Sequence, residues 1–369
     1  MKEISLWQLP KKSTHVILEK EIQKQLFEKA AAKEGSLYEL TKLFGENDSV
    51  YYWHNGTRET IPLWALEKIA LIAGESLEEI EQNATGVKSG YQGTTVKMAF
   101  PIAITPEFDA IVANLLGDGC FSGYGKTASY KQKNEFARRL FTEKLRHCLG
   151  KFELNEKQYA GQWKVIIPKI IIECIETAYQ FEETDTLSRR VPKEIKTKER
   201  EFRVAFLAAF VLDEGHINEG IEVYSGNRLL LQDILEIVKS LGYDATEIKE
   251  RNGHGSKNCF YRFRIKVQGC KNFLTDLDEL CKKHPNCGLA HEYEALKFAS
   301  TRVRHKTLNG VTREEILKIL PEVKTVKAIT RTLKITSSTV REHLKKLEKT
   351  GKVEKIGREQ NRTIWQPIT

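Results

Sequence analysis

Residues 111–119 read Ile-Val-Ala-Asn-Leu-Leu-Gly-Asp-Gly, and residues 207–215 read Leu-Ala-Ala-Phe-Val-Leu-Asp-Glu-Gly. Each is an apolar run that contains small residues and is closed by an acid and then a glycine. The residues before the first run, Thr105-Pro106-Glu107, form a typical helix start, with an N-cap threonine, a proline at the first helical position and an acid near the positive end. The pattern predicts a helix from Pro106 to Asp118, with the closing glycine in the left-handed position just past the helix end.

The same prediction places Asp118 and Glu214 at the negative ends of their helices. A carboxylate there is disfavoured by roughly 0.3–1 kcal/mol. A local rule is therefore broken at two matched positions, which is expected where function compensates. A bound cation is one compensation. For either copy alone, an acid tolerated at a surface helix end is the alternative.

The segments that follow the two acids are also similar. In both copies, strand-like pieces lead to an asparagine that opens an amphipathic helix ending in Leu-Gly, from Asn134 to Gly150 and from Asn227 to Gly242. Two copies of helix–strand–strand–helix–strand–strand–helix indicate an internal duplication, which in space suggests a pseudo-twofold axis. The expected fold class is α+β.

The two stretches resemble the paired motifs of the LAGLIDADG homing endonucleases, in the single-chain form that carries both copies. The resemblance covers about residues 100–285. Ala113 and Gly117 are small residues four apart, which let the paired helices of that family approach closely, and Ala209 holds the first small position of the second copy. The resemblance implies a nuclease that hydrolyses double-stranded DNA at specific sites, as a monomer with an internal pseudo-dimer.

The second copy departs from the family pattern at one position, because Asp213 stands where a small residue is usual. Register against Gly215 makes Glu214 the counterpart of Asp118. Asp213 then takes the place of Gly117, near the seam between the helices, where a charge needs a partner or solvent. Asp213→Gly is therefore expected to keep activity and to raise thermal stability.

The resemblance also implies a set of site residues. The metal candidates at the paired helix ends, expected to hold Mg²⁺, are Asp118, Glu214, Gly117 and Asp213. Gln132 and Lys133 match the polar pair that many members place beside the active acid, where such a group orients water or balances phosphate charge. A solvated strand end is the alternative reading of that pair. Lys266 is a further candidate for a catalytic cation.

Residues 261–266 alternate aromatic or aliphatic residues with basic ones. A strand with this period of two presents a basic face, which suits phosphates or base edges in a DNA groove. The candidate DNA-binding residues of the duplicated region are Lys131, Arg262 and Arg264.

A possible metal site follows in the sequence. A tetrahedral zinc ion could be held by residues with the spacing of Cys281, His284, Cys287 and His291. A helix end followed by a turn, with thiols simply buried, is the alternative.

Charge is unevenly distributed along the 369 residues, whose net charge is +9. Residues 301–369 carry 17 Lys and Arg against 7 Asp and Glu, whereas residues 1–100 carry 12 against 14. This asymmetry suggests nucleic-acid contact toward the C-terminus. The apolar runs are too short for a membrane span, and seven scattered cysteines suit a reducing cytoplasm. We therefore expect a cytoplasmic protein that does not bind membranes.

Two modules are expected to flank the duplicated core. Residues 1–83 resemble an all-α helix-turn-helix domain, in which Asn55 and Arg58 could face DNA, although aromatic clusters such as the one beside them are more often core. Residues 311–369 resemble a winged helix, with helices at 312–320, 326–333 and 337–347 and a two-stranded wing. Its candidate DNA-binding residues are Ser337, Ser338, Thr339, Arg341, Lys345, Arg358 and Arg362. A helical interaction module is the alternative for this segment.

The resulting domain boundaries place a linker at residues 84–104, the core at 105–285 with repeats 105–183 and 197–285, and a second linker at 286–310. Two functions fit this arrangement. One is a metal-dependent DNA endonuclease of the homing type. The other is a transcription regulator that binds DNA without cleaving it and reuses a LAGLIDADG-like core between helix-turn-helix modules. The presence of both acids, Asp118 and Glu214, favours the enzyme.

Overall fold

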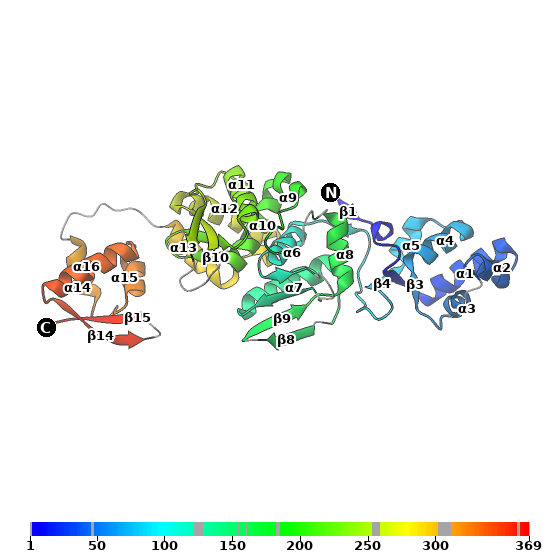
Figure 1. Ribbon diagram of the computed structural model, residues 1–369, viewed down its shortest axis with the longest axis horizontal. Coiled ribbons are helices and arrows are strands. Elements are labelled where there is room, and N and C mark those ends of the chain that lie inside the picture. The colour runs from blue at the N-terminus through cyan, green and yellow to red at the C-terminus, as the bar shows by residue number, and fades with distance from the viewer. Residues whose placement is uncertain are drawn as a thin grey trace.

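The computed structural model describes the backbone of residues 2–45, 48–121, 128–153, 155–159, 161–179, 181, 185–252, 259–301, 311–359 and 362–368. These residues form an elongated molecule, with the N-terminal region at one end, the duplicated region in the middle and the C-terminal module at the other end (Figure 1). Within the described ranges, no helix combines the length and the apolar character needed to cross a membrane. The chain is α+β, as expected.

The N-terminal region is not all-α, in contrast to the prediction. Its helices are α1 (Lys20–Glu34), α2 (Leu37–Lys42), α3 (Ser49–His54), α4 (Leu63–Ala73) and α5 (Leu77–Gln82). They pack with an antiparallel sheet in the order β3-β2-β4, made of β2 (Thr14–Leu18), β3 (Thr60–Pro62) and β4 (Ala84–Ser89). Strand β2 alternates buried and half-buried residues, and the chain becomes helical at Lys20.

Residues 84–104, expected to be a linker, are built into the fold. Strand β4 completes the N-terminal sheet, and β5 (Ile102–Ala103) pairs with β1 (Glu3–Ile4). Ser13 and Ser89 both donate hydrogen bonds to Glu173, a buried carboxylate on α8 (Lys169–Ala178). The hydrophobic core is continuous from Ile4 to Ala299. The N-terminal region is therefore fixed against the first half of the duplicated region.

The duplicated region consists of two halves with the same order of elements. The first half contains α6 (Pro106–Leu116), β6 (Gly119–Cys120), β7 (Ser129–Gln132), α7 (Glu135–Leu149), β8 (Asn155–Tyr159), β9 (Gln162–Ile166) and α8. The second half contains α10 (Arg200–Glu214), β10 (Gly215–Ile217), β11 (Ile221–Ser225), α11 (Arg228–Ser240), β12 (Lys249–Asn252), β13 (Cys259–Ile265) and α12 (Val267–Lys283). The sheets run β6-β7-β9-β8 and β10-β11-β13-β12, so the strand order is the same in both halves. The short helix α9 (Lys193–Thr197) lies between the halves in sequence.

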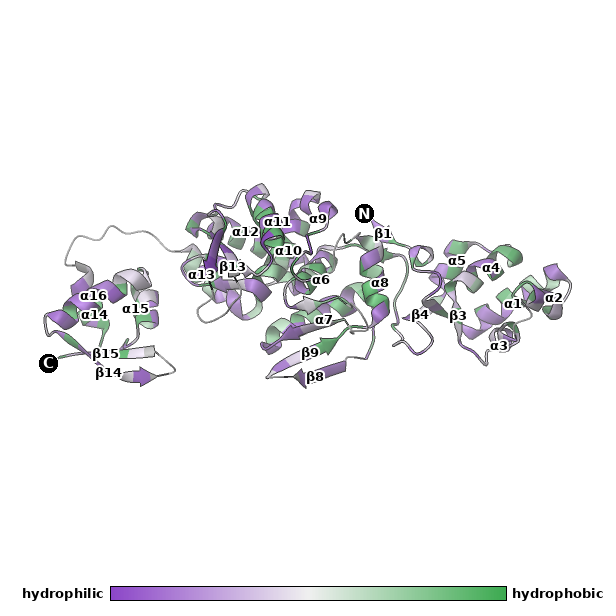
Figure 2. Cartoon of the chain, viewed as in Figure 1, coloured by the Kyte–Doolittle hydropathy of each residue, from purple (hydrophilic) through white to green (hydrophobic). Residues whose placement is uncertain are grey.

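Helices α6 and α10 pack against each other in the middle of this region. Every residue of α6 from Pro106 to Leu116 is buried, and α10 is buried from Val204 to Leu212. Helices α6, α8 and α10 are mostly hydrophobic, whereas strand β8 at a sheet edge is mostly hydrophilic (Figure 2). The two acid-bearing helices therefore form the centre of the core, and their C-terminal ends lie where the two halves meet.

The glycines after the acids do not adopt the left-handed conformation that the sequence predicts. Helix α6 ends at Leu116, two residues earlier than expected, and the chain enters β6 at Gly119. Gly215 has φ −98° and ψ 155°, which is extended backbone. Both positions need glycine for space instead, because a Cβ at 119 would lie 2.4 Å from the Leu115 Cα and one at 215 would lie 2.3 Å from the Val211 carbonyl oxygen.

Residues 286–310, also expected to be a linker, are folded up to Thr301. They include the 3-10 turns η2 (Pro285–Cys287) and η3 (Ala290–Glu292) and helix α13 (Tyr293–Ser300), which packs on α12. The C-terminal module has its own hydrophobic core. It consists of α14 (Val311–Ile319), α15 (Val326–Leu333), α16 (Ser337–Lys349) and the antiparallel hairpin β14 (Val353–Glu359) and β15 (Arg362–Pro367). These elements match the expected winged-helix pattern within a few residues.

Candidate active site and nucleic-acid interface

The ends of α6 and α10 bring Asp118 and Glu214 close enough to interact electrostatically. Asp118 lies in the turn after α6, and Glu214 is the last residue of α10. Burial raises the pKa of Asp118 to about 6. Burial, and then the nearby charge of Asp118, raise the pKa of Glu214 to about 7. The ionised forms of both carboxylates are thus disfavoured by their surroundings.

Gln132 connects the end of strand β7 to this pair. Its side-chain Nε2 donates to Asp118 Oδ2 over 3.0 Å, and its Oε1 accepts from the backbone N–H of Asn134 over 3.1 Å. These two bonds fix the side-chain amide in one orientation. Lys133 is exposed next to it. Lys266 instead pairs with Asp244 at 2.8 Å, beyond the end of β13, and no described contact joins it to the acids.

Arg189 is a buried cation at the same place that the sequence analysis did not select. Its guanidinium donates to the carbonyl oxygens of Leu115, Leu116 and Gly117 at the C-terminal end of α6. Its charge also opposes the increase in the pKa of Glu214. The Arg189 side chain therefore supplies part of the positive charge that offsets the acids at the negative ends of the two helices. The signal in the sequence was weak, since Arg189 lies in an irregular segment without periodicity.

Asp213 faces the first half across the helix seam. Its Oδ1 accepts from the Tyr130 hydroxyl over 2.6 Å, and its Oδ2 accepts from the Asn114 amide over 2.7 Å. An ideal Cβ at Gly117 would lie 3.0 Å from the Asp213 Cβ. Both oxygens of Asp213 are therefore engaged by protein donors, and the small residue required at this seam is Gly117.

The residues fit a hard divalent cation as a two-carboxylate site. Among the residues that the structure describes, no group of three or more His, Cys, Asp or Glu side chains is arranged to hold a metal ion. Mg²⁺ is commonly bound through one or two carboxylates, with waters and substrate phosphate oxygens as the remaining ligands. Asp118 and Glu214, whose ionised forms are both disfavoured by burial, match that donor set.

Basic residues lie in register across both sheets. In the first sheet, Lys131 on β7 pairs with Lys164 on β9, which pairs in turn with Lys157 on β8. In the second sheet the equivalent row is Tyr224, Arg262 and Lys249. Like charges directly opposite on neighbouring strands are destabilising. Such rows are therefore expected where an anion covers them.

The strand pattern around Arg262 is as the sequence predicted. Phe263 and Ile265 are buried, and Arg262 and Arg264 alternate with them along β13. Arg262 forms an ion pair with Glu222 at 3.2 Å, and Arg264 lies 3.9 Å from Glu219. Both arginines thus have acidic neighbours on their own sheet.

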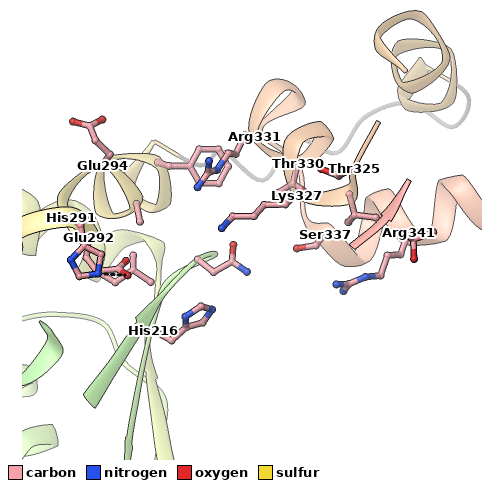
Figure 3. Close-up of a pocket in the computed structure, with 16 residues that line it drawn as sticks. His216, His291, Glu292, Glu294, Thr325, Lys327, Thr330, Arg331, Ser337 and Arg341 are labelled. Carbon is pink, nitrogen blue, oxygen red and sulfur yellow. Dashed lines mark ion pairs between the residues drawn. The ribbon is translucent and has the colours of Figure 1, made fainter. Parts of the chain in front are cut away.

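The start of α16 contacts the second half of the core. The backbone N–H and the hydroxyl of Ser337 both donate to Glu219 Oε1, over 2.6 and 2.8 Å. Figure 3 shows the adjacent cleft, of about 810 Å³, in which His216 and Glu294 lie on the core side and Lys327, Arg331 and Arg341 on the side of the C-terminal module. The expected DNA-reading face of the module is therefore turned toward the core.

The remaining candidates of the C-terminal module are distributed along α16 and the wing. Thr339 is held by Thr336, the N-cap of α16, and Ser338 also bonds to that cap. Lys345 and Arg358 are exposed. The side chain of Arg362 lies outside the described residues.

The N-terminal candidates serve local structure. Asn55 is the C-cap of α3 and accepts from the Thr57 backbone N–H, and the Arg58 guanidinium donates to Ser49 and stacks on the Tyr52 ring.

Of the possible zinc residues, His284 bonds to Glu107 at 2.8 Å and Cys287 is buried. The four residues form no metal-binding group in the described part of the chain.

Residues 310–355 match the family model described as bacterial regulatory protein, arsR family. The match identifies a helix-turn-helix in the C-terminal module, which supports DNA binding by this part of the chain. No curated protein matches the chain significantly.

Several solved structures are similar at low identity. I-DmoI in complex with DNA and Ca has 14% identity and a TM-score of 0.35, over 52% of this chain and 97% of that chain. A structure of mesophilic variants of the homing endonuclease I-DmoI has the same identity, coverage and TM-score. Full-length DUF199/WhiA from Thermatoga maritima has 11% identity and a TM-score of 0.33, over 67% of this chain and 92% of that chain. Likenesses this weak do not establish the family of the whole chain.

Proposed function

We propose that this protein is a metal-dependent endonuclease of the LAGLIDADG type, which binds double-stranded DNA and hydrolyses its phosphodiester bonds at a specific site. The observation that carries the proposal is the meeting of Asp118 and Glu214 at the ends of two abutting helices, where each acid is partly buried and the charge of Asp118 opposes ionisation of Glu214. In this proposal the two halves arose by duplication and are related by a pseudo-twofold axis, since their element and strand orders are the same.

Asp118 and Glu214 would hold the divalent ion, which supplies charge stabilisation and lowers the pKa of a bound water. Gln132 would keep the Asp118 carboxylate in a single orientation through its 3.0 Å bond. Lys133, exposed at the strand end, would lie beside the scissile phosphate. Hydrolysis forms a bond between a water oxygen and phosphorus and breaks one P–O bond of the backbone. Asp213, with both oxygens engaged, is assigned no ligand role.

The rows Lys131–Lys164–Lys157 and Tyr224–Arg262–Lys249 would contact DNA, because they lie at equivalent positions of the two sheets. The C-terminal module would add affinity for neighbouring sequence through largely salt-dependent contacts. Among its residues, Ser337, Ser338, Thr339, Arg341 and Lys345 would meet the DNA from α16, and Arg358 and Arg362 from the wing. Lys164, Lys157 and Lys249 become additional DNA-binding candidates.

Cleavage of a randomised duplex library in Mg²⁺, with the DNA ends sequenced, tests the proposal. We expect cleavage at a defined site by the wild type, and loss of at least about 10²-fold in rate for both Asp118→Asn and Glu214→Gln, with DNA binding retained. Glu236→Gln, at an exposed carboxylate on α11, is the matched control and should cleave normally. A wild type that binds duplex DNA but cleaves none would overturn the nuclease.

The second candidate is a transcription regulator without catalysis. The arsR-family match at residues 310–355 favours it, because that model describes regulatory proteins. If the protein is a regulator, we expect it to bind a specific DNA site without cleaving the DNA, and we expect this binding not to depend on Asp118 or Glu214. The same library, recovered by binding instead of cleavage, distinguishes the two.

A further inference from the structure

A chain of buried polar side chains runs from α7 to the seam beneath the two acids. The Lys144 ammonium donates to Asn114 Oδ1 over 2.6 Å, and the Asn114 amide donates to Asp213 Oδ2 over 2.7 Å. Tyr130 donates to the other oxygen of Asp213. Lys144, Asn114 and Tyr130 are 2%, 1% and 0% exposed, so none of the three is a solvated surface group.

The orientation of Asn114 follows from its two neighbours. The Lys144 amine donates to Asn114 Oδ1, so the asparagine oxygen faces Lys144 and the asparagine nitrogen is left to donate to Asp213 Oδ2. Asn114 therefore links the amine of Lys144 to a carboxyl group on the opposite helix. Burying Lys144 without such a link would be costly.

The equivalent positions of the other half carry no polar network. Counting from the capping asparagines 134 and 227, Tyr130 corresponds to Val223 and Lys144 corresponds to Ile237. Counting from the acids 118 and 214, Asn114 corresponds to Phe210. Val223, Ile237 and Phe210 are all buried and apolar. Asp213 itself corresponds to Gly117. Four positions differ together, so all the partners of Asp213 come from the first half.

We infer that Tyr130, Asn114 and Lys144 are positioning residues, which hold Asp213 and thereby set the register of α10 on α6. Glu214 is the next residue after Asp213, so this register decides where the Glu214 carboxylate lies relative to Asp118. The inference rests on the proposed nuclease function. It assigns to the buried network a role in placing the second acid, without contact to DNA or metal.

The test is a Mg²⁺ titration of cleavage by the full-length protein. Tyr130→Phe removes only a hydroxyl, and Asn114→Leu removes the link at similar volume. We expect each to raise the Mg²⁺ concentration for half-maximal rate by roughly 10–100-fold, the cost typical of groups that orient metal ligands. DNA affinity measured in Ca²⁺ should stay within about threefold, because the basic rows are untouched.

Tyr243→Phe is the matched control, since the Tyr243 hydroxyl also bonds to a carboxylate, that of Asp276 on α12, within the second half. It should leave the Mg²⁺ requirement unchanged. If Asn114→Leu fails to fold, Tyr130→Phe alone decides the matter. A wild type that cleaves, with Tyr130→Phe at the wild-type Mg²⁺ requirement, overturns the positioning role alone. A wild type that cleaves no duplex overturns the proposed function, and the positioning role with it.

Discussion

The two halves of the central region connect a strand to the following helix, β7 to α7 and β11 to α11, through the same capping hydrogen bonds but with different residues. In the first half, Asn134 caps α7 by accepting from two backbone N–H groups, and its own N–H donates to the side chain of Gln132. In the second half, Asn227 caps α11 in the same way, and its N–H donates to Ser225. The connection is thus symmetric, but the glutamine has an amide nitrogen left to reach Asp118 and the serine does not.

The polar side chains at the seam between α6 and α10 are also unevenly distributed between the halves. The polar groups Tyr130, Asn114 and Lys144 all belong to the first half, and the carboxyl group that Tyr130 and Asn114 contact, that of Asp213, belongs to the second. The two halves therefore have the same order of strands, whereas the polar partners of Asp213 come from the first half. Exchanging residues between equivalent positions separates what the scaffold requires from what the site requires.

The largest effect is expected for Gly117→Asp, which gives the first half the residue of the second. Its Cβ would lie 3.0 Å from the Asp213 Cβ, and the new carboxylate would lie beside an existing one. We expect a loss of about 3 kcal/mol or more in the free energy of unfolding, from overpacking and an unpaired charge. Denaturant unfolding measures it. Gly226→Asp, where the nearest side-chain atom is 4.0 Å away, is the control.

The double variant Gly117→Asp, Asp213→Gly tests whether stability depends on which half supplies the acid at the seam. It restores one acid and one glycine at the seam, but the partners of the acid stay in the first half. We expect the double variant to remain destabilised. Wild-type stability of the double variant would show that the seam does not depend on which half supplies the acid.

The next effect is that of Asp213→Gly alone. The pattern of the family led us to expect higher stability, but the contacts reverse that expectation, because the Tyr130 hydroxyl and the Asn114 amide would lose their acceptor. An unsatisfied buried donor costs about 1–3 kcal/mol, so we expect a loss of at least about 2 kcal/mol for the two. Asp213→Asn, which preserves an acceptor for one of them, should lose less. An increase in the midpoint of thermal unfolding for Asp213→Gly would contradict the network.

A smaller effect, confined to activity, is expected for Gln132→Ser. Serine can still accept from Asn134, as Ser225 accepts from Asn227, so the free energy of unfolding should change by less than about 1 kcal/mol. The bond to Asp118 is lost, and we expect cleavage to slow by roughly 10–100-fold. Ser225→Gln is the matched exchange in the other half and should leave the rate unchanged. Equal cleavage rates for Gln132→Ser and the wild type would show that Gln132 does not contribute to the proposed active site.

The sequence predicted the elements well where periodicity and caps were strong. Helix α15 has the expected bounds, 326–333, and Asn134 and Asn227 cap their helices as expected. The sheet beside α1 was missed, because the strand Thr14–Leu18 runs directly into the helix and its alternation is short. Pairing between segments as distant as β2 and β4 leaves no local pattern in the sequence.

The candidate site was predicted in part. The acids and Gln132 were selected because they follow recognisable elements, and the structure brings the three together. Lys144 was missed, although the signal was present: it lies seven residues after Ala137 and three after Phe141, on the apolar face of α7. A charge on an apolar face predicts a buried partner, but the partner, Asn114, is on another helix and cannot be identified from sequence spacing alone.

The smallest effect concerns the contact between the second half and the C-terminal module. Glu219 lies in the turn between β10 and β11, and it accepts from the backbone N–H and the hydroxyl of Ser337 at the start of α16. The positive end of a helix is a site that a DNA phosphate can occupy. In the proposed function, Glu219 would compete with DNA for the start of α16.

Glu219→Gln should weaken this contact, because a neutral amide interacts less strongly with a helix N-terminus than a carboxylate does. The difference is about 0.3–1 kcal/mol, so duplex DNA should bind the full-length protein roughly two- to fivefold more tightly at low salt. Glu236→Gln removes the same charge from the core at a position on α11 that pairs with Lys196, and it controls for net charge. Equal gains in affinity for the two variants would mean that general repulsion, and not the contact with Ser337, limits binding. A gain confined to Glu219→Gln would show that the core restrains the recognition helix until DNA displaces it.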